Sequence, residues 1–254
     1  MKEPVSSGAE ADDLALLHLD IETTFVLSGS ERIERENDPD CSSGPRVIFT
    51  GCRQGNIARV RHDVGDQVAQ SLLAVAAEEP PWRDPHVLPQ CLGKLIDLLS
   101  CDQPVVTIGP GVVYRLPNGL RYEHPAKIVR GDSAEGEQML ARFAERGLPQ
   151  SMLDVGFKGV GDFWEPWCVA LAGDEIASIA FAARIGPVGA EAGVYTFPGF
   201  RAQGFAAAIT AVWSSLPSLN GRALFYSTAR SNRSSQRVAA RLGLRLIGAS
   251  VRVS

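Results

Sequence analysis

The turn at residues 198–206, PGFRAQGFA, is the stretch of this sequence best suited to binding an anion. β-Branched and aromatic residues at 194–197 predict a strand before it, and the apolar residues that follow Gly204 predict a helix after it. The first N–H groups of a helix lack internal partners, and the peptide dipoles place about half a positive charge there. Small residues at Gly204 and Ala206 leave the backbone accessible, so the turn is suited to a diphosphate.

A second polar turn lies at residues 227–235, STARSNRSS, between a predicted strand at 223–227 and a predicted helix ending at Gly243. Asn232 is a good helix N-cap, with Ser235 at the third position. Six arginines crowd this part of the chain. We interpret them as a solvated surface with contacts to cofactor phosphates: Arg222, Arg230, Arg233, Arg237, Arg241 and Arg245.

Together the two turns resemble the GNAT superfamily of acetyl-CoA-dependent N-acetyltransferases. Thr196-x-Pro198-x-x-Arg201-x-x-Gly204-x-Ala206 is similar to its pyrophosphate signature, R/Q-x-x-G-x-G/A, and residues 227–244 resemble its N-x-x-A/S helix and "L-G-F" turn. The resemblance covers residues 126–254. It implies an α/β fold with a mixed central sheet flanked by helices, and acetyl-CoA as cosubstrate without a metal.

The resemblance also implies which residues hold the cosubstrate. In the superfamily the fourth and fifth strands separate, and the pantetheine arm lies along the fourth strand as a neighbouring strand would. The backbone of that strand, the diphosphate turn and the last helix would therefore bind it here, through Tyr195, Thr196, Phe197, Arg201, Ala202, Gln203, Gly204, Phe205, Ala206, Asn232 and Ser235.

Transfer to an amine needs a base, because a free alkyl ammonium has a pKa of about 10. Glu191 is the candidate, since superfamily members often carry a glutamate nearby, although their usual position corresponds to Ala190. A shift of one residue turns a side chain to the other face of a strand unless a bulge corrects it. Glu165 and Asp162 are candidates for lining the acceptor pocket.

The departing thiolate needs a proton. The superfamily often supplies it from a tyrosine on the last helix, where this chain has Ala239. Tyr195, Tyr226 and Ser227 are the substitutes to consider. Cys168 lies in an apolar strand, where a thiolate is disfavoured, so direct transfer is preferred over an acyl-cysteine route.

The remaining elements are predicted from periodicity. In the first half, a loose tail over residues 1 to about 12 and a helix or strand at 14–25 precede a hairpin at 46–61, helices at 65–79 and 89–99, and a strand at 105–116. In the second half, the superfamily order predicts strands at 127–130, 167–172, 176–184 and 190–197, and helices at 133–146 and 232–242.

Only one strand, residues 244–253, follows the last predicted helix, whereas the superfamily closes with two. The edge beside the fifth strand would then be open, which is a liability for pairing. We expect the N-terminal half or a second subunit to cover it. Residues 1–125 are accordingly predicted to be an accessory region, either sheet-completing or a diverged copy of the fold, and a homodimer is possible.

Composition narrows the class of protein. The chain has 254 residues, 45% of them hydrophobic and 21% charged, and a net charge of -4, which gives no reason to expect nucleic acid as a partner. Its five cysteines lack metal-site spacing, and no signal or membrane-spanning pattern is present, so a cytoplasmic location without a membrane partner is expected.

The sequence therefore predicts an acetyl-CoA-dependent N-acetyltransferase acting on a small-molecule or peptide amine. One alternative is a degenerate acyl-CoA sensor or scaffold, favoured by Ala239 and the displaced Glu191. Another is a nucleotide-phosphate binder of a different fold. The sequence leaves the identity of the amine open.

Overall fold

The computed structural model describes residues 12–101 and 103–254, so the expected N-terminal tail lies almost wholly outside it. The helices are α1 (Asp13–Thr24), α2 (Asp66–Ala77), α3 (Leu92–Ser100), α4 (Ala134–Arg146), α5 (Gln150–Leu153), α6 (Phe205–Trp213) and α7 (Arg233–Arg241), with short 3-10 turns at η1 (Val160–Asp162), η2 (Pro198–Phe200) and η3 (Pro217–Leu219). The strands are β1 (Phe25–Leu27), β2 (Ile33–Glu36), β3 (Val47–Cys52), β4 (Gly55–Val60), β5 (Ile108–Leu116), β6 (Lys127–Arg130), β7 (Cys168–Ala172), β8 (Glu175–Ile185), β9 (Gly189–Thr196), β10 (Ala223–Ala229) and β11 (Arg245–Val253).

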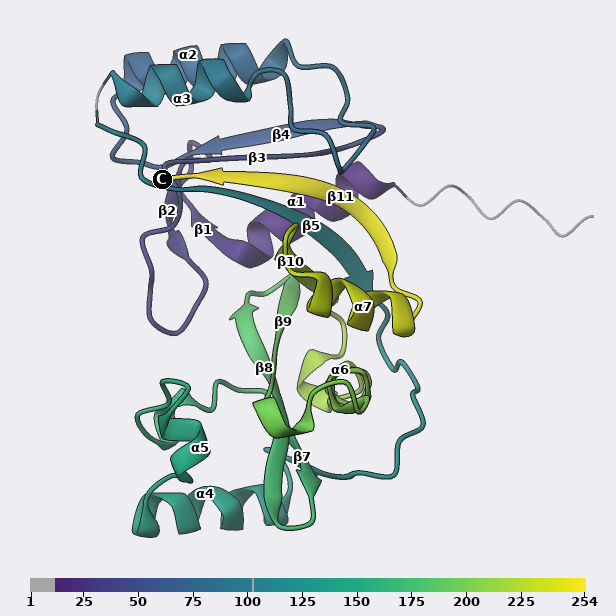
Figure 1. Ribbon diagram of the computed structural model, residues 1–254. Helices are drawn as coiled ribbons and strands as arrows, with labels where there is room; N and C mark the ends of the chain where they lie inside the picture. The colour runs from purple at the N-terminus through teal and green to yellow at the C-terminus, as the bar shows by residue number, and fades with distance from the viewer. Residues whose placement is uncertain (1–11, 102) are drawn as a thin grey trace, which may run out of the picture.

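Nine strands form one mixed sheet in the order β4-β3-β11-β5-β10-β9-β8-β7-β6, and β1 and β2 pair separately. This confirms the predicted α/β class and the central sheet flanked by helices (Figure 1). The hairpins at β3–β4 and β7–β8 are also confirmed. The undecided segment at residues 14–25 is the helix α1, capped by the Asp12 carboxylate, which accepts from Ala15 N–H.

Helices cover both faces of the sheet. Alternate residues of β3 show the division: Val47 and Phe49 pack under α2 and α3, whereas Ile48 packs under α1. The same alternation continues along β5 and β10. It shows that α6 and α7 lie on the same face of the sheet as α2 and α3. The other face carries α1, with α4 and α5 farther along it (Figure 1).

The edge beside the fifth strand of the resembling region is covered within the chain. β5, from the first half, pairs antiparallel with β10 on one side and with β11 on the other. The pairing of β3 with β11 then extends the sheet farther. The first half is therefore sheet-completing, and no second subunit is needed at this edge. The division into parts at residue 125 stays a prediction.

Candidate functional site

The diphosphate turn has the conformation that its sequence predicts. Gly204 caps α6 with φ +95° and ψ -7°, and no side chain caps the helix. A Cβ at Gly204 would lie 3.2 Å from the His124 ring and 3.5 Å from a guanidinium nitrogen of Arg241. Because left-handed backbone is costly for other residues, both conformation and space favour glycine here. The amides of the first helical turn have no intrahelical acceptor.

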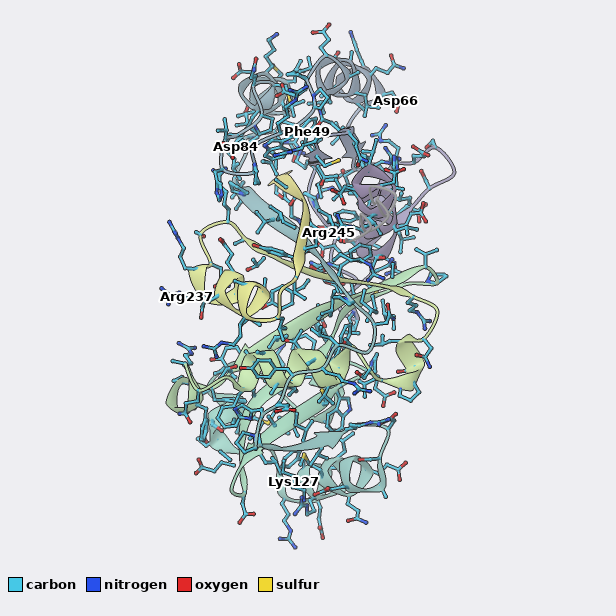
Figure 2. The ribbon with its side chains drawn as sticks, turned by 90° about the vertical axis from the view of Figure 1, so that its right-hand side faces the viewer. Phe49, Asp66, Asp84, Lys127, Arg237 and Arg245 are labelled. Carbon is cyan, nitrogen blue, oxygen red and sulfur yellow. The ribbon has the colours of Figure 1, made fainter. Side chains whose placement is uncertain are left out.

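This turn opens onto a cavity of about 310 Å³ between α6 and α7. Six predicted cofactor residues line it: Thr196, Arg201, Ala202, Gly204, Phe205 and Ala206. The opposite wall comes from α7 and adds Ser234, Arg237, Val238 and Arg241. Figure 2 shows Arg237 at the surface of α7. The cavity thus combines free helix amides with three guanidinium groups, a combination suited to phosphate groups.

Sequence reasoning found this wall only in part. Arg237 and Arg241 were included in the basic cluster, but Ser234 was not identified. The signal was present in the spacing of the two arginines, since residues four apart lie on one face of a helix. What the sequence could not show is that this face is turned toward α6.

Arg201 is positioned by the turn itself. Its Nε–H donates to the Thr196 carbonyl over 3.2 Å, and its guanidinium lies 6.0 Å from the centre of the Tyr195 ring. Gln203 does not line the cavity; its side-chain amide donates to the Gly199 carbonyl at 3.1 Å. The two side chains therefore bridge the two ends of the turn.

His124 supports the turn from the segment between β5 and β6, a role that no pattern in the sequence predicts. Ala126 N–H donates to Nδ1 at 3.1 Å, so the neutral ring carries its proton on Nε2 and donates it to the Gln203 carbonyl at 3.0 Å. The ring also packs on Phe205, with centroids 4.8 Å apart.

Replacing this histidine should loosen the turn without removing a phosphate contact. For His124→Ala we expect the affinity for coenzyme A to fall about fivefold to tenfold, in line with the loss of about one hydrogen bond worth ~1 kcal/mol. Titration calorimetry checks this. His124→Asn, which keeps a donor, should recover part of the affinity, and an unchanged affinity in His124→Ala would contradict the supporting role.

β9 and β10 separate beside the turn. Their parallel pairing is confined to residues 189–191 of β9 and 223–225 of β10. Beyond it, β9 pairs only with β8, and β10 only with β5. The strands therefore diverge on the way to the diphosphate turn, as the resemblance implies.

The residues of β9 whose backbone N–H and C=O groups face this gap are not all those that the resemblance implies. Phe197 N–H donates to the Ala177 carbonyl at 3.0 Å, and the Tyr195 carbonyl accepts from the Ser178 hydroxyl at 2.8 Å. Since alternate residues of an antiparallel strand bond to the same neighbour, Val194 and Thr196 turn their backbone groups toward the gap. Of the three residues expected to bond the pantetheine, only Thr196 is so oriented.

Glu191 lies where the two strands part, paired in register with Phe225. Ala190, before it, packs in the core beneath α6. The Glu191 side chain therefore projects to the opposite face, where only 9% of its surface is exposed and its Oε2 accepts from Arg184 at 2.7 Å. By the same alternation Tyr195 lies on this face, and so does Ser227, which is paired with Val113. The three catalytic candidates thus share one face but lie at different levels along the strands.

Tyr226 projects to the other face, beneath α7. It is buried, and burial raises the pKa of its hydroxyl. Ala239, the position of the missing tyrosine, is also buried in the core. Asn232 caps α7, with its side chain accepting from Ser235 N–H at 3.1 Å, as predicted. Neither Asn232 nor Ser235 lines the cavity between α6 and α7.

The remaining candidates have structural partners or are exposed. The Asp162 carboxylate accepts from Lys158 N–H and, at 3.1 Å, from Gly159 N–H, so it closes its own loop. Glu165 is exposed. Burial raises the pKa of the Cys168 thiol well above its usual range, as expected for an unreactive strand cysteine.

Within residues 12–101 and 103–254, no group of three or more His, Cys, Asp or Glu side chains is arranged to hold a metal ion. In the same ranges, none of the helices is both long and apolar enough to cross a bilayer.

Comparisons with known proteins give structural matches only. No protein-family model matches the chain, and no curated protein matches it in sequence. Among solved structures, a protein of Novosphingobium aromaticivorans assigned to the GNAT family is 20% identical, with a TM-score of 0.39 over 59% of this chain and 65% of that one. A GCN5-related N-acetyltransferase from Kribbella flavida is 16% identical, with a TM-score of 0.41 over 65% of this chain and 63% of that one.

This chain thus spans less than two thirds of the length of the Novosphingobium aromaticivorans and Kribbella flavida proteins. A GNAT-family acetyltransferase from Colwellia psychrerythraea matches over 98% of both chains, with 12% identity and a TM-score of 0.43. These likenesses concern the fold alone, and with TM-scores below 0.5 they add no argument about chemistry.

Proposed function

We propose that the protein is an acetyltransferase that binds acetyl-CoA between α6 and α7 and transfers the acetyl group directly to an amine. One observation carries the proposal: free amides at the start of α6 and three arginines line a single cavity beside the gap between β9 and β10. The diphosphate would lie against Gly204 and Ala206. The pantetheine would follow the edge of Val194 and Thr196 toward Glu191.

In this arrangement Glu191 takes the proton of the acceptor amine. Backbone N–H groups at the Glu191 end of the gap, such as that of Val194, are suited to polarising the thioester carbonyl, which is worth about 3 kcal/mol per donor in other enzymes. Tyr195 and Ser227 on the same face are the candidates to protonate the leaving thiolate, with Tyr226 as the candidate on the α7 side. The acceptor is a small-molecule or peptide amine, and a homodimer is compatible with the proposal.

Calorimetric titration with coenzyme A tests the binding step. We expect saturable binding that weakens with salt, and a weaker effect of ATP or NAD. The double variant Arg237→Ala/Arg241→Ala removes two charged contacts worth roughly 1.5–3 kcal/mol each, so affinity should fall at least tenfold. Arg233→Ala is the matched control, because Arg233 is exposed on the same helix and does not line the cavity. Equal affinities in the two variants would place the phosphates elsewhere.

Thiol release from acetyl-CoA with a panel of amines tests the transfer step; the panel comprises spermidine, tyramine, kanamycin, free amino acids and a short peptide. We expect release that depends on one class of amine. For Glu191→Gln, loss of the proton acceptor should lower the rate about 10²- to 10⁴-fold with little change in coenzyme A affinity. A variant as active as the wild type would exclude Glu191 as the base.

The second candidate function is an acyl-CoA sensor without turnover. Two observations favour it: Ala239 stands where the superfamily has a tyrosine, and the Glu191 carboxylate is already paired with Arg184. Coenzyme A binding without amine-dependent thiol release from any member of the panel would support the sensor.

A further inference from the structure

Five charged side chains from five elements meet on the α1 face of the sheet. They are Asp20 of α1, Glu36 of β2, Arg184 of β8, Glu191 of β9 and Arg252 of β11. Three of these elements belong to the region resembling acetyltransferases, and two belong to the accessory half. The cluster therefore joins the two parts of the chain at the candidate base.

The two arginines are engaged by the two glutamates. Arg184 donates to Glu191 Oε2 at 2.7 Å from Nη1, and to Glu36 Oε2 at 2.8 Å from Nε. Arg252 donates to the other oxygen of Glu36. Asp20 is different: it is buried, and within the described residues its Oδ1 has no hydrogen-bond partner.

The charges of the cluster do not balance if every group is ionised, because three carboxylates face two guanidinium groups. A buried carboxylate without a partner is unfavourable, so the proton is expected on Asp20. Burial is the main cause that raises the pKa of Asp20 to about 8. The charge of Glu191 raises it further, whereas Arg184 and Arg252 lower it.

Three members of the cluster act on the Asp20 carboxyl through their charge: Glu191, Arg184 and Arg252. α1 also packs on β1, β3, β4 and β10, and the buried apolar residues of these strands that share its hydrophobic cluster include Phe25, Ile48, Cys52, Ile57 and Phe225. Among the charged members, Glu191 is the one that also lies where β9 and β10 part, beside the proposed path of the thioester.

We propose that Asp20 is a positioning residue for proton transfer. By losing its own proton, Asp20 makes Glu191 a competent acceptor for the proton of the amine, although the guanidinium groups of Arg184 and Arg252 belong to the same cluster. This inference rests on the proposed acetyl transfer. When Asp20 is neutral, the charge of Glu191 is balanced by its ion pair with Arg184. When Asp20 is ionised, a second negative charge beside Glu191 strengthens its affinity for a proton.

The step balances without a further reactant. An N–H bond of the ammonium breaks and its proton moves to Glu191; the nitrogen lone pair forms the C–N bond at the thioester carbonyl, and the C–S bond breaks. The thiolate takes the second amine proton. Overall, R–NH3⁺ and acetyl-CoA give the amide, the free thiol and one proton, which leaves the cluster for solvent.

The test is the variant Asp20→Asn, which keeps the size of the side chain and fixes it in a neutral state. With the most active amine of the panel as acceptor, wild-type kcat/KM should rise through about pH 8 to a plateau. In Asp20→Asn the rising limb should disappear, leaving kcat/KM at pH 9 about tenfold below wild type. Asp13→Asn, on the same helix but paired with Arg245 outside the cluster, should keep the wild-type profile.

Carboxyl-carbon NMR of the coenzyme-bound protein gives a readout that does not depend on turnover. We expect the Asp20 resonance to titrate near pH 8 and that of Glu191 to shift with it, and the Glu191 step to be lost in Asp20→Asn. An Asp20 already ionised at pH 6 would overturn the proposal, as would an unchanged pH profile in Asp20→Asn. Failure of acetyl transfer itself has a different signature, the absence of amine-dependent thiol release in the wild type whether or not coenzyme A binds, and would overturn both proposals.

Discussion

Gly204→Ala is expected to weaken coenzyme A binding by tenfold or more. Alanine at φ +95° costs about 1–2 kcal/mol in backbone strain, which the turn can relieve only by rotating the amides that would face the diphosphate. The new Cβ would also lie 3.2 Å from the His124 ring, so the neighbour that supports the turn must shift. Calorimetry with coenzyme A measures the affinity, and thermal unfolding measures the strain.

Gly199→Ala is the matched control. Gly199 lies in the same turn, has no positive φ, and a Cβ there would meet nothing within 4 Å. Its affinity and stability should stay close to wild type. If both variants bound coenzyme A as the wild type does, the start of α6 would not be the phosphate site. If both lost affinity equally, the effect would belong to the turn as a whole and not to Gly204.

Asp20→Asn should change how stability depends on pH. The carboxyl has a pKa of about 8 in the folded protein and an ordinary value of 3.8 when unfolded. Between these values the folded state holds a proton that the unfolded state has lost, so the free energy of unfolding falls as pH rises. The slope is at most ~1.4 kcal/mol per pH unit and disappears above the folded pKa.

Asparagine has no proton to lose, so the variant should lack this contribution. Between pH 5 and 8 the difference in unfolding free energy between wild type and Asp20→Asn should change by up to ~4 kcal/mol, with wild type relatively more stable at the lower pH. Denaturant unfolding at several pH values measures it. Asp13→Asn, which breaks an ion pair at the surface, should shift the curve by ~1 kcal/mol or less without altering its slope. Parallel curves for wild type and Asp20→Asn would contradict the buried proton.

The sequence was sufficient wherever the signals were local. The strand, glycine turn and helix around Gly204 follow from residues adjacent in the chain, and so does the cap at Asn232. Both hairpins could be predicted for the same reason, whereas the order of strands and longer helices from β6 to β11 was expected from the resemblance to the superfamily. The chemistry of the turn needs only backbone amides, which one short segment supplies.

Only the tertiary structure decided what distant segments do to one another. It placed β5 between β10 and β11 and α1 over Glu191, because strand pairing and helix docking depend on complementary surfaces that no local pattern encodes. It also decided that Ser234, Arg237 and Arg241 face the turn, and that Asp20 is buried beside a carboxylate. The charge state of Asp20 is set by solvent exclusion, and that exists only once both halves of the chain have packed together.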